Sequence, residues 1–340
     1  MRTEKKTLYL HIGLPKTATS FLQEDVFKHI PSCQCLVKPS VVLNNETVRF
    51  SDLFSWSPKC WKKVGENPFE CEGHIVDTII SDEAIFGGIS HPSPWLDDVV
   101  DSNGDTVELR RDTRVDTRPN ELSSHLKEIK TKYKSWGFSD LKVLMGIRRQ
   151  DTLLASYYAQ KSDRIRGARQ SHFEDWVRHI LFTKKGYYKK GGSKLEYFSW
   201  FRVISNVLSK KNVYIYTLEQ IKDNSSKFFE QLLSFLGIQD NICLQRHLSK
   251  KSRRDGRSES NSIWSIQKPK RTGPGLPVGR LFSLIGLPIK IALRSPDFLR
   301  QNKIQLNSKL SDEVLGVFES DNKKIDKKIT PVSLSQYGYY

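Results

Sequence analysis

The chain has 340 residues, of which 37% are hydrophobic and 11% aromatic, and this is enough to bury a substantial core in one large domain or two small ones. No stretch reaches the roughly 18 apolar residues that a membrane span needs, so we expect a soluble, cytoplasmic protein. The 55 Lys and Arg residues outnumber the 38 Asp and Glu residues, and the resulting net charge of +17 predicts an anionic ligand, polymer or membrane surface.

The first predicted element is a buried strand, residues 8–12, which runs into a Gly/Pro turn and then a helix in the sequence LYLHIGLPKTATSFLQ. Such a turn gathers backbone N–H groups and the positive end of the helix dipole, and Lys16 adds a mobile charge. It is therefore typical of a phosphate or sulfate site. It is not a Walker A loop, because Lys16 follows Gly13 by three residues and no glycine precedes it. An ordinary turn with Lys16 in solvent is the alternative.

The second predicted strand, residues 75–80, ends in the sequence TIISDEAIFGG. A carboxylate at the carboxyl end of a parallel strand points into the crevice where open α/β sheets bind ligands. Asp82 and Glu83 can therefore both reach a substrate. A helix-start or loop carboxylate without chemistry is the alternative reading.

Two irregular stretches rich in Pro and polar residues, 31–71 and 87–119, flank this strand and are predicted to be insertions at the ligand-facing edge of the sheet. After them, apolar residues recur at spacings of four and three from Leu122 to Trp136. This period predicts a buried helix that ends at Gly137.

The third predicted strand, residues 143–147, begins the sequence VLMGIRRQDTLLASYYAQ, in which Asp151 is expected to be a helix N-cap. Arg148 at the strand end and Ser156 on the helix can converge on one phosphate, through the guanidinium and the hydroxyl. Two anion sites at neighbouring strand ends suggest one ligand with two anionic ends. The alternative, for each residue taken alone, is that Arg148 and Arg149 are surface charges and that Ser156 is a hydroxyl on the helix surface.

A fourth strand at residues 213–216 and helices at 225–236 and about 303–326 complete the predicted elements. Strands that alternate with helices predict a parallel sheet covered by helices. A mobile loop is expected at about 250–280, where the segment 268–280 is rich in Pro and Gly.

Together these residues resemble the sulfotransferases that use 3′-phosphoadenosine 5′-phosphosulfate (PAPS), in their bacterial and carbohydrate-directed branch. The sequence PKTATSFLQ is similar to the 5′-phosphosulfate loop of that family, and RRQDTLLASYY is similar to its 3′-phosphate motif. The stretch VYIYTLEQIKDNSSKFFEQLLSFLGI and the ending FESDNKKIDKKI…LSQYGYY extend the resemblance to Tyr340. Ala18 replaces the commoner Gly, and Gln150 stands where a Pro is often found.

The resemblance implies a P-loop-like, three-layer α/β fold with a central, mainly parallel sheet flanked by helices, built as one sulfotransferase domain over residues 1–340. It implies that Lys16, Thr17, Ala18, Thr19 and Ser20 wrap the 5′-phosphosulfate, and that Phe21 packs near the adenine. Lys16 would stabilise the negative charge on the bridging oxygen as the S–O bond breaks, a role that requires no metal. Arg148 and Ser156 would bind the 3′-phosphate. Residues that could replace the family's late glycine-rich loop are Arg253, Arg254 and Arg257.

Transfer to a hydroxyl or amine needs a general base, and Glu83 is the favoured candidate, followed by Asp82 and then by His11 or His74. A glycan or a glycolipid headgroup suits the basic charge, whereas a small phenol or alcohol is the alternative acceptor. The apolar segment 280–294 has basic ends and could lie at a bilayer interface, although core packing is the alternative.

Two other functions remain open from the sequence alone. A P-loop kinase or nucleotidase is suggested by IISDE, which resembles a strand that ends in a metal-binding acid, but the Walker A spacing is lost. A non-catalytic polyanion-binding protein would explain the net charge. No nucleic-acid partner is expected, because the aromatic residues are not interleaved with the basic ones.

The five cysteines are odd in number and widely spread, which favours free thiols. A zinc site made of Cys33, Cys35, Cys60 and Cys71 is the alternative, but the paired two-residue spacing of such sites is missing.

Overall fold

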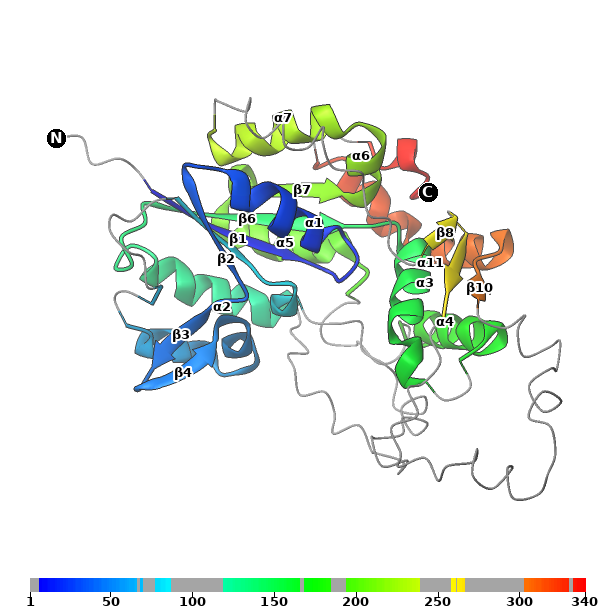
Figure 1. Ribbon diagram of the computed structural model, residues 1–340, viewed down its shortest axis with the longest axis horizontal. Helices are drawn as coiled ribbons and strands as arrows, with labels where there is room; N and C mark the ends of the chain where they lie inside the picture. The colour runs from blue at the N-terminus through cyan, green and yellow to red at the C-terminus, as the bar shows by residue number, and fades with distance from the viewer. Residues whose placement is uncertain are drawn as a thin grey trace, which may run out of the picture.

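The computed structural model describes residues 6–65, 68–69, 77–86, 119–165, 168–184, 194–238, 258–260, 262–266, 303–329 and 333–340. Its centre is a five-stranded parallel sheet with the strand order β2-β5-β1-β6-β7 (Figure 1). The strands are β1 (Thr7–Gly13), β2 (Cys33–Val37), β5 (Asp77–Ser81), β6 (Asp140–Ile147) and β7 (Val213–Thr217). The predicted α/β fold, with a parallel sheet flanked by helices, is confirmed.

The strand order places a topological switch point between β1 and β6. From β1 the chain continues to β2 and β5 on one side, whereas β6 and β7 lie on the other side. Gly13, the last residue of β1, pairs with Gly146 of β6, so the loops that follow these two strands begin at the same edge. Ligands of open α/β sheets bind at such a switch point, outside the carboxyl ends of the strands.

Helices cover both faces of the sheet (Figure 1). One face packs against the helical segment 19–29, which begins with α1 (Thr19–Phe21), and against α6 (Leu218–Asp223) and α7 (Ser225–Leu236). The other packs against α2 (Pro119–Lys132) and α5 (Tyr197–Leu208). Side chains of β1 point alternately to the two faces: Leu8 and Leu10 pack on the side of α2 and α5, and Tyr9 packs on the side of α6 and α7. This alternation gives the three layers.

The remaining elements surround this framework. The helices α3 (Gln150–Lys161), α4 (Gln170–Lys184) and α11 (Ser308–Asp326) pack together beside α5. A small antiparallel sheet contains β8 (Ser258–Ser260), β9 (Ile263–Ser265) and β10 (Lys303–Gln305), and a hairpin contains β3 (Ser40–Leu43) and β4 (Glu46–Arg49). The described helices include none that is long and apolar enough to cross a membrane.

The structure differs from the predicted elements at three places. The helix predicted to end at Gly137 is α2, which ends at Lys132, because turn hydrogen bonds such as that from the Ser135 N–H to the Lys132 carbonyl follow it. The stretch 31–71 contributes the edge strand β2 to the main sheet, which its half-buried, mixed sequence CQCLV did not indicate. The last helix begins at Ser308, because Asn307 caps it by accepting a hydrogen bond from the N–H of Leu310, and 303–305 forms β10 instead. By contrast, α7 spans the predicted 225–236 and ends at Gly237 in the left-handed conformation.

Several predictions fall outside the described residues. These are most of the insertion at 87–119, most of the loop at 250–280, the apolar segment 280–294, and His74, Arg253, Arg254 and Arg257.

Candidate functional site

The loop after β1 turns sharply before the helical segment 19–29 begins. Lys16 has a φ of 75° and Ala18 a φ of 65°, in a region that few residues other than glycine adopt. Thr17 between them is fully buried, and its hydroxyl donates a hydrogen bond to the carbonyl of Leu14 at 2.7 Å. Ala18 thus takes the left-handed conformation at the position where the resembled motif commonly has Gly.

Two glycines allow this loop to lie directly on the strand ends. A Cβ atom built on Gly13 would lie 2.9 Å from the Thr17 hydroxyl oxygen, and one on Gly146 would lie 2.8 Å from it. The Cβ on Gly146 would also lie 2.4 Å from the hydroxyl oxygen of Tyr216. Larger residues at either glycine would therefore displace the loop.

A buried network of polar side chains, centred on His11 of β1, lies next to this loop. The two ring nitrogens of His11 contact the hydroxyls of Ser81 at 2.5 Å and Tyr216 at 2.7 Å, and Gln23 donates to the Ser81 hydroxyl at 2.9 Å. Burial lowers the pKa of His11 to about 3, so this ring is neutral at physiological pH. Because both nitrogens are occupied and His11 is 1% exposed, it is a structural group rather than a base for a substrate.

The two carboxylates after β5 have different surroundings. Asp82 is fully buried, accepts a hydrogen bond from the N–H of Ala84 at 3.0 Å and pairs with Arg49 at 3.3 Å. Glu83 is only partly buried and accepts a hydrogen bond at 2.8 Å from the hydroxyl of Thr19, which begins α1. Glu83 therefore lies beside the loop after β1, whereas Asp82 holds its own turn together.

Arg148 connects the two predicted anion motifs. Its Nη1 donates to the carbonyl oxygen of Lys16 at 3.3 Å, and its Nε donates to the hydroxyl of Thr152 at 3.1 Å. Arg148 is 8% exposed, and burial lowers the pKa of its guanidinium, while the nearby Glu219 carboxylate opposes that shift. Its Nη2 makes no hydrogen bond to any residue that the structure describes. The guanidinium is thus fixed at the loop with one donor group available.

The start of α3 differs from the prediction. The helix begins at Gln150, and Asp151 does not cap it; instead Asp151 forms a paired ion contact with Arg149, at 2.8 and 3.0 Å. The predicted N-cap role of Asp151 is therefore wrong, because its carboxylate is engaged by this guanidinium. Thr152, in the first turn of α3, was not among the predicted site residues. The available signal was a hydroxyl in the first helical turn after the arginine at the end of the strand.

The other predicted donor-binding residues lie near these motifs. Ser156 is half-buried on α3, one turn after Thr152. Ser20 is exposed at the start of the helical segment, and the half-buried Phe21 packs against Phe229 of α7 with ring centroids 6.3 Å apart. The structure thus places Phe21 on the α7 side of the loop.

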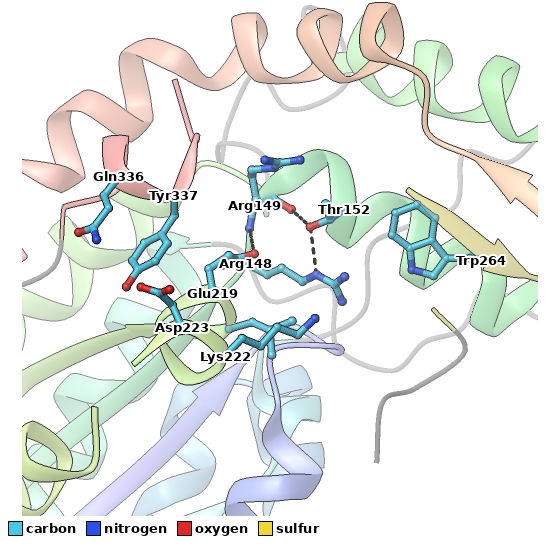
Figure 2. A pocket seen from close by; sticks show the side chains of 10 residues that line it. Arg148, Arg149, Thr152, Glu219, Lys222, Asp223, Trp264, Gln336 and Tyr337 are labelled. Carbon is cyan, nitrogen blue, oxygen red and sulfur yellow. Dashed lines mark hydrogen bonds between the residues drawn. The ribbon is translucent and has the colours of Figure 1, made fainter. Parts of the chain in front are cut away.

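A cavity of about 550 Å³ opens beside Arg148 (Figure 2). Trp264 of β9 and Tyr337 near the C-terminus lie on opposite sides of Arg148. The described residues that line the cavity are Arg148, Arg149, Thr152, Leu218, Glu219, Lys222, Asp223, Trp264, Gln336 and Tyr337. This volume lies within the usual range for small-molecule sites, about 300–1,000 Å³.

The arrangement can bind an anion and accept a proton. The Arg148 guanidinium offers charge-assisted hydrogen bonds, Lys16 lies in the loop that Arg148 contacts, and Glu83 is a carboxylate on the far side of that loop. Among the described residues no group of three His, Cys, Asp or Glu side chains could hold a metal ion. Cys33, Cys35 and Cys60 are free thiols, and Cys71 lies outside the described residues.

Comparison with known proteins gives a family match. The family model described as "Sulfotransferase domain" matches residues 8–273. No curated protein matches the chain. Among solved structures, a sulfotransferase from Alicyclobacillus acidocaldarius is 10% identical with a TM-score of 0.45, and the match covers 98% of this chain and 99% of that one. Mouse sulfotransferase SULT7A1 complexed with PAP is 12% identical with a TM-score of 0.41, over 96% of this chain and 87% of that one.

Proposed function

Because the chain belongs to the sulfotransferase domain family, we propose that it transfers the sulfuryl group of PAPS to a hydroxyl or amine of a glycan or glycolipid. The observation that carries this proposal is the hydrogen bond from Arg148 to the carbonyl of Lys16. It joins the two predicted anion-binding motifs at one sheet edge, which supports a ligand with a 5′-phosphosulfate and a 3′-phosphate. A nucleotide without the 3′-phosphate would leave Arg148 without its anion.

We assign the donor-binding roles by the family resemblance. Lys16, Thr17, Ala18, Thr19 and Ser20 hold the 5′-phosphosulfate, and Phe21 lies toward the adenine. Arg148 and Ser156 bind the 3′-phosphate. The buried guanidinium of Arg148 supports its role, because a buried charge needs an ionic partner.

In the proposed reaction the acceptor oxygen bonds to sulfur, the bond from sulfur to the phosphate oxygen breaks, and Glu83 takes the acceptor proton. Lys16 stabilises the charge that develops on the departing phosphate oxygen. Glu83 is better placed than Asp82 for this step, since Asp82 is fully buried in its own turn. His11 is enclosed by Ser81 and Tyr216.

We propose that the chain forms one sulfotransferase domain and acts in the cytoplasm, where it can meet a glycolipid headgroup at a membrane surface. The net charge of +17 supports an acceptor or surface that is itself anionic. An assay with radiolabelled PAPS against cell polysaccharide and lipid fractions identifies the acceptor class.

The cofactor assignment is tested by thermal unfolding with 3′-phosphoadenosine 5′-phosphate, AMP and ATP. A ligand at 100 times its Kd adds about 2.7 kcal/mol to stability, so the bisphosphate is expected to raise Tm more than AMP or ATP. Equal stabilisation by ATP would contradict the proposal and favour a kinase. Sulfuryl transfer is also expected to persist in excess chelator, whereas kinase activity would be lost.

A further inference from the structure

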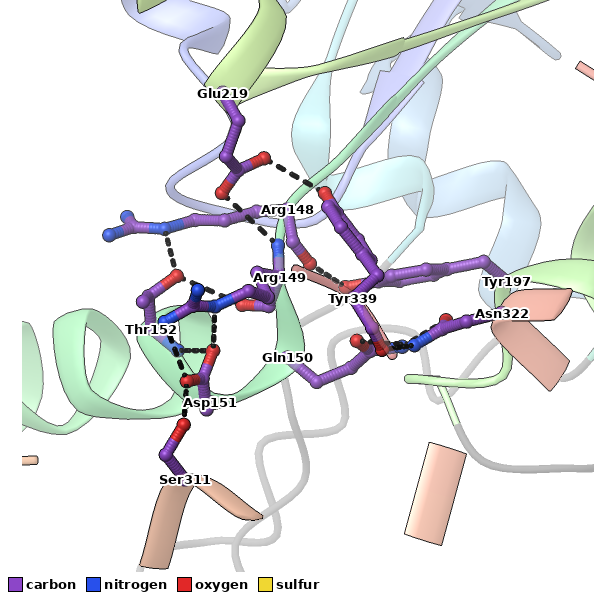
Figure 3. Close-up of polar contacts among 10 residues, drawn as sticks. All are labelled: Arg148, Arg149, Gln150, Asp151, Thr152, Tyr197, Glu219, Ser311, Asn322 and Tyr339. Carbon is purple, nitrogen blue, oxygen red and sulfur yellow. Dashed lines mark hydrogen bonds and ion pairs between the residues drawn. The ribbon is translucent and has the colours of Figure 1, made fainter. Parts of the chain in front are cut away.

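The loop that carries Arg148 is held by groups from distant parts of the chain (Figure 3). The carbonyl of Arg148 accepts a hydrogen bond from the hydroxyl of Tyr197 at 2.5 Å, and the N–H of Arg149 donates to Oε1 of Glu219 at 3.3 Å. These contacts join the residues between β6 and α3 to α5 and α6. The position of the guanidinium therefore depends on neighbours that are not adjacent to it in sequence.

Tyr339, the second-last residue, connects these contacts. Its hydroxyl donates to Oε2 of Glu219 at 2.8 Å, and its carbonyl accepts a hydrogen bond from the amide of Asn322 at 2.9 Å. The side chains of Asn322 and Gln150 form a reciprocal pair at 2.8 and 3.1 Å. Tyr339, Asn322 and Gln150 are all fully buried. Hydrogen bonds through Asn322 thus connect the C-terminal segment to Gln150, the first residue of α3.

The shape of residues 333–340 places Tyr339 in the interior. Gly338 has a φ of 69°, and a Cβ on it would lie 3.3 Å from Nη1 of Arg149. Tyr337 before this turn lines the cavity, whereas Tyr339 after it is buried. Tyr340 is 39% exposed, and its hydroxyl donates to Asp326 at 2.6 Å, away from this cluster.

We infer that Tyr339 is a positioning residue for the anion site: it holds the Glu219 carboxylate and so leaves the Arg148 guanidinium for a phosphate. This inference rests on the proposed function, in which Arg148 binds the 3′-phosphate. Glu219 and Arg148 line the same cavity. The two oxygens of Glu219 are held by the Tyr339 hydroxyl and the Arg149 N–H, so the carboxylate is kept from pairing with the guanidinium.

The chemistry of the tyrosine suits this role. Burial, with Glu219 beside it, raises the pKa of Tyr339 well above its ordinary value, so the phenol remains a hydrogen-bond donor at all physiological pH values. Without that donor, Oε2 of the partly buried Glu219 carboxylate loses its hydrogen-bond partner. Arg148 lines the same cavity, its charge interacts with Glu219, and it has a donor group available, so an ion pair between the two would compete with a bound phosphate.

The test is titration calorimetry of the full chain with 3′-phosphoadenosine 5′-phosphate and with AMP, which lacks the 3′-phosphate. Tyr339→Phe is expected to weaken bisphosphate binding about tenfold and to change AMP binding less than about twofold. Tyr340→Phe removes a tyrosine–carboxylate hydrogen bond from the same segment and is the matched control, with both affinities unchanged. Equal losses for both nucleotides, or none, would overturn the inference.

A second variant separates positioning from general loosening of the fold. Glu219→Gln removes the competing charge but keeps an oxygen for the Arg149 N–H, so adding it to Tyr339→Phe is expected to restore most of the bisphosphate affinity. Glu219→Gln alone is expected to bind the bisphosphate at least as tightly as the wild type. No recovery in the double variant would overturn the role of Glu219. A wild type that binds AMP and the bisphosphate equally would instead refute the proposed function, and the inference with it.

Discussion

Asp82 and Glu83 are adjacent carboxylates with different surroundings, and we propose different roles for them. The Glu83 carboxylate is partly exposed beside Thr19, and that of Asp82 is buried against Ala84 and Arg49. We expect Glu83→Gln to abolish sulfuryl transfer with bisphosphate affinity intact, because Gln can still accept from Thr19 but cannot take a proton. Single-turnover rates and calorimetry measure the two effects.

Asp82→Asn serves as the comparison for that experiment. It is expected to keep most of the transfer activity and to lower the free energy of unfolding by about 1–3 kcal/mol, since it weakens a buried ion contact. Normal turnover in Glu83→Gln, together with lost turnover in folded Asp82→Asn, would assign the base to Asp82.

Lys16 lies in the loop after β1, and its carbonyl oxygen accepts a hydrogen bond from the Arg148 guanidinium. If its ammonium group acts on the leaving oxygen, Lys16→Ala should reduce kcat by more than it weakens binding of the bisphosphate product, which has no bond to break. The comparison needs kcat from steady-state assays and Kd from calorimetry. Matched losses in both quantities would show that Lys16 only binds the nucleotide.

At the scale of elements, the contact between β1, β6 and the loop depends on the absence of a side chain at Gly146. Gly146→Ala would place a Cβ 2.4 Å from the Tyr216 hydroxyl and 2.8 Å from that of Thr17. We expect a loss of about 1–3 kcal/mol in the free energy of unfolding, and weaker bisphosphate binding because the loop moves. Urea unfolding and calorimetry measure these changes.

Gly316 provides the matched control for that substitution. It lies on α11, with no atom within 4 Å of a built Cβ. Gly316→Ala should therefore stabilise the protein by about 0.5–1 kcal/mol through helix propensity alone. A Gly146→Ala variant as stable as the wild type would mean that Tyr216 can move away without cost.

The sequence predicts the elements that rest on local periodicity and misses those that depend on distant partners. Four strands of the main sheet and α7 follow from apolar runs and the stop at Gly237. The meeting of Lys16 and Arg148 was expected, because their parallel strands end at one edge. In contrast, β2 has no apolar run, and the contacts of Tyr339 with Glu219 and Asn322 join residues that no local pattern relates.

At the scale of the whole molecule, buried histidines lie on both faces of the sheet. His11 packs beside Phe27 in the core under α7, and His125 of α2 accepts a hydrogen bond from Trp61 at 2.9 Å. Burial lowers the pKa of His11 to about 3 and that of His125 to about 4. Because the unfolded chain binds these protons near pH 6.5 and the folded chain does not, this stability is complete above pH 6.5. It falls as the pH decreases toward 4 for His125 and toward 3 for His11.

The expected loss at pH 5, relative to pH 7.5, is about 2 kcal/mol for each of these histidines. Urea unfolding at the two pH values measures it. His125→Gln keeps an acceptor for the Trp61 N–H but does not titrate, so it should reduce the pH-dependent loss by about 2 kcal/mol even if it lowers stability at pH 7.5. An unchanged loss in this variant would mean that the core around α2 opens to water before His125 takes up its proton, and that groups other than His125 cause the acid sensitivity.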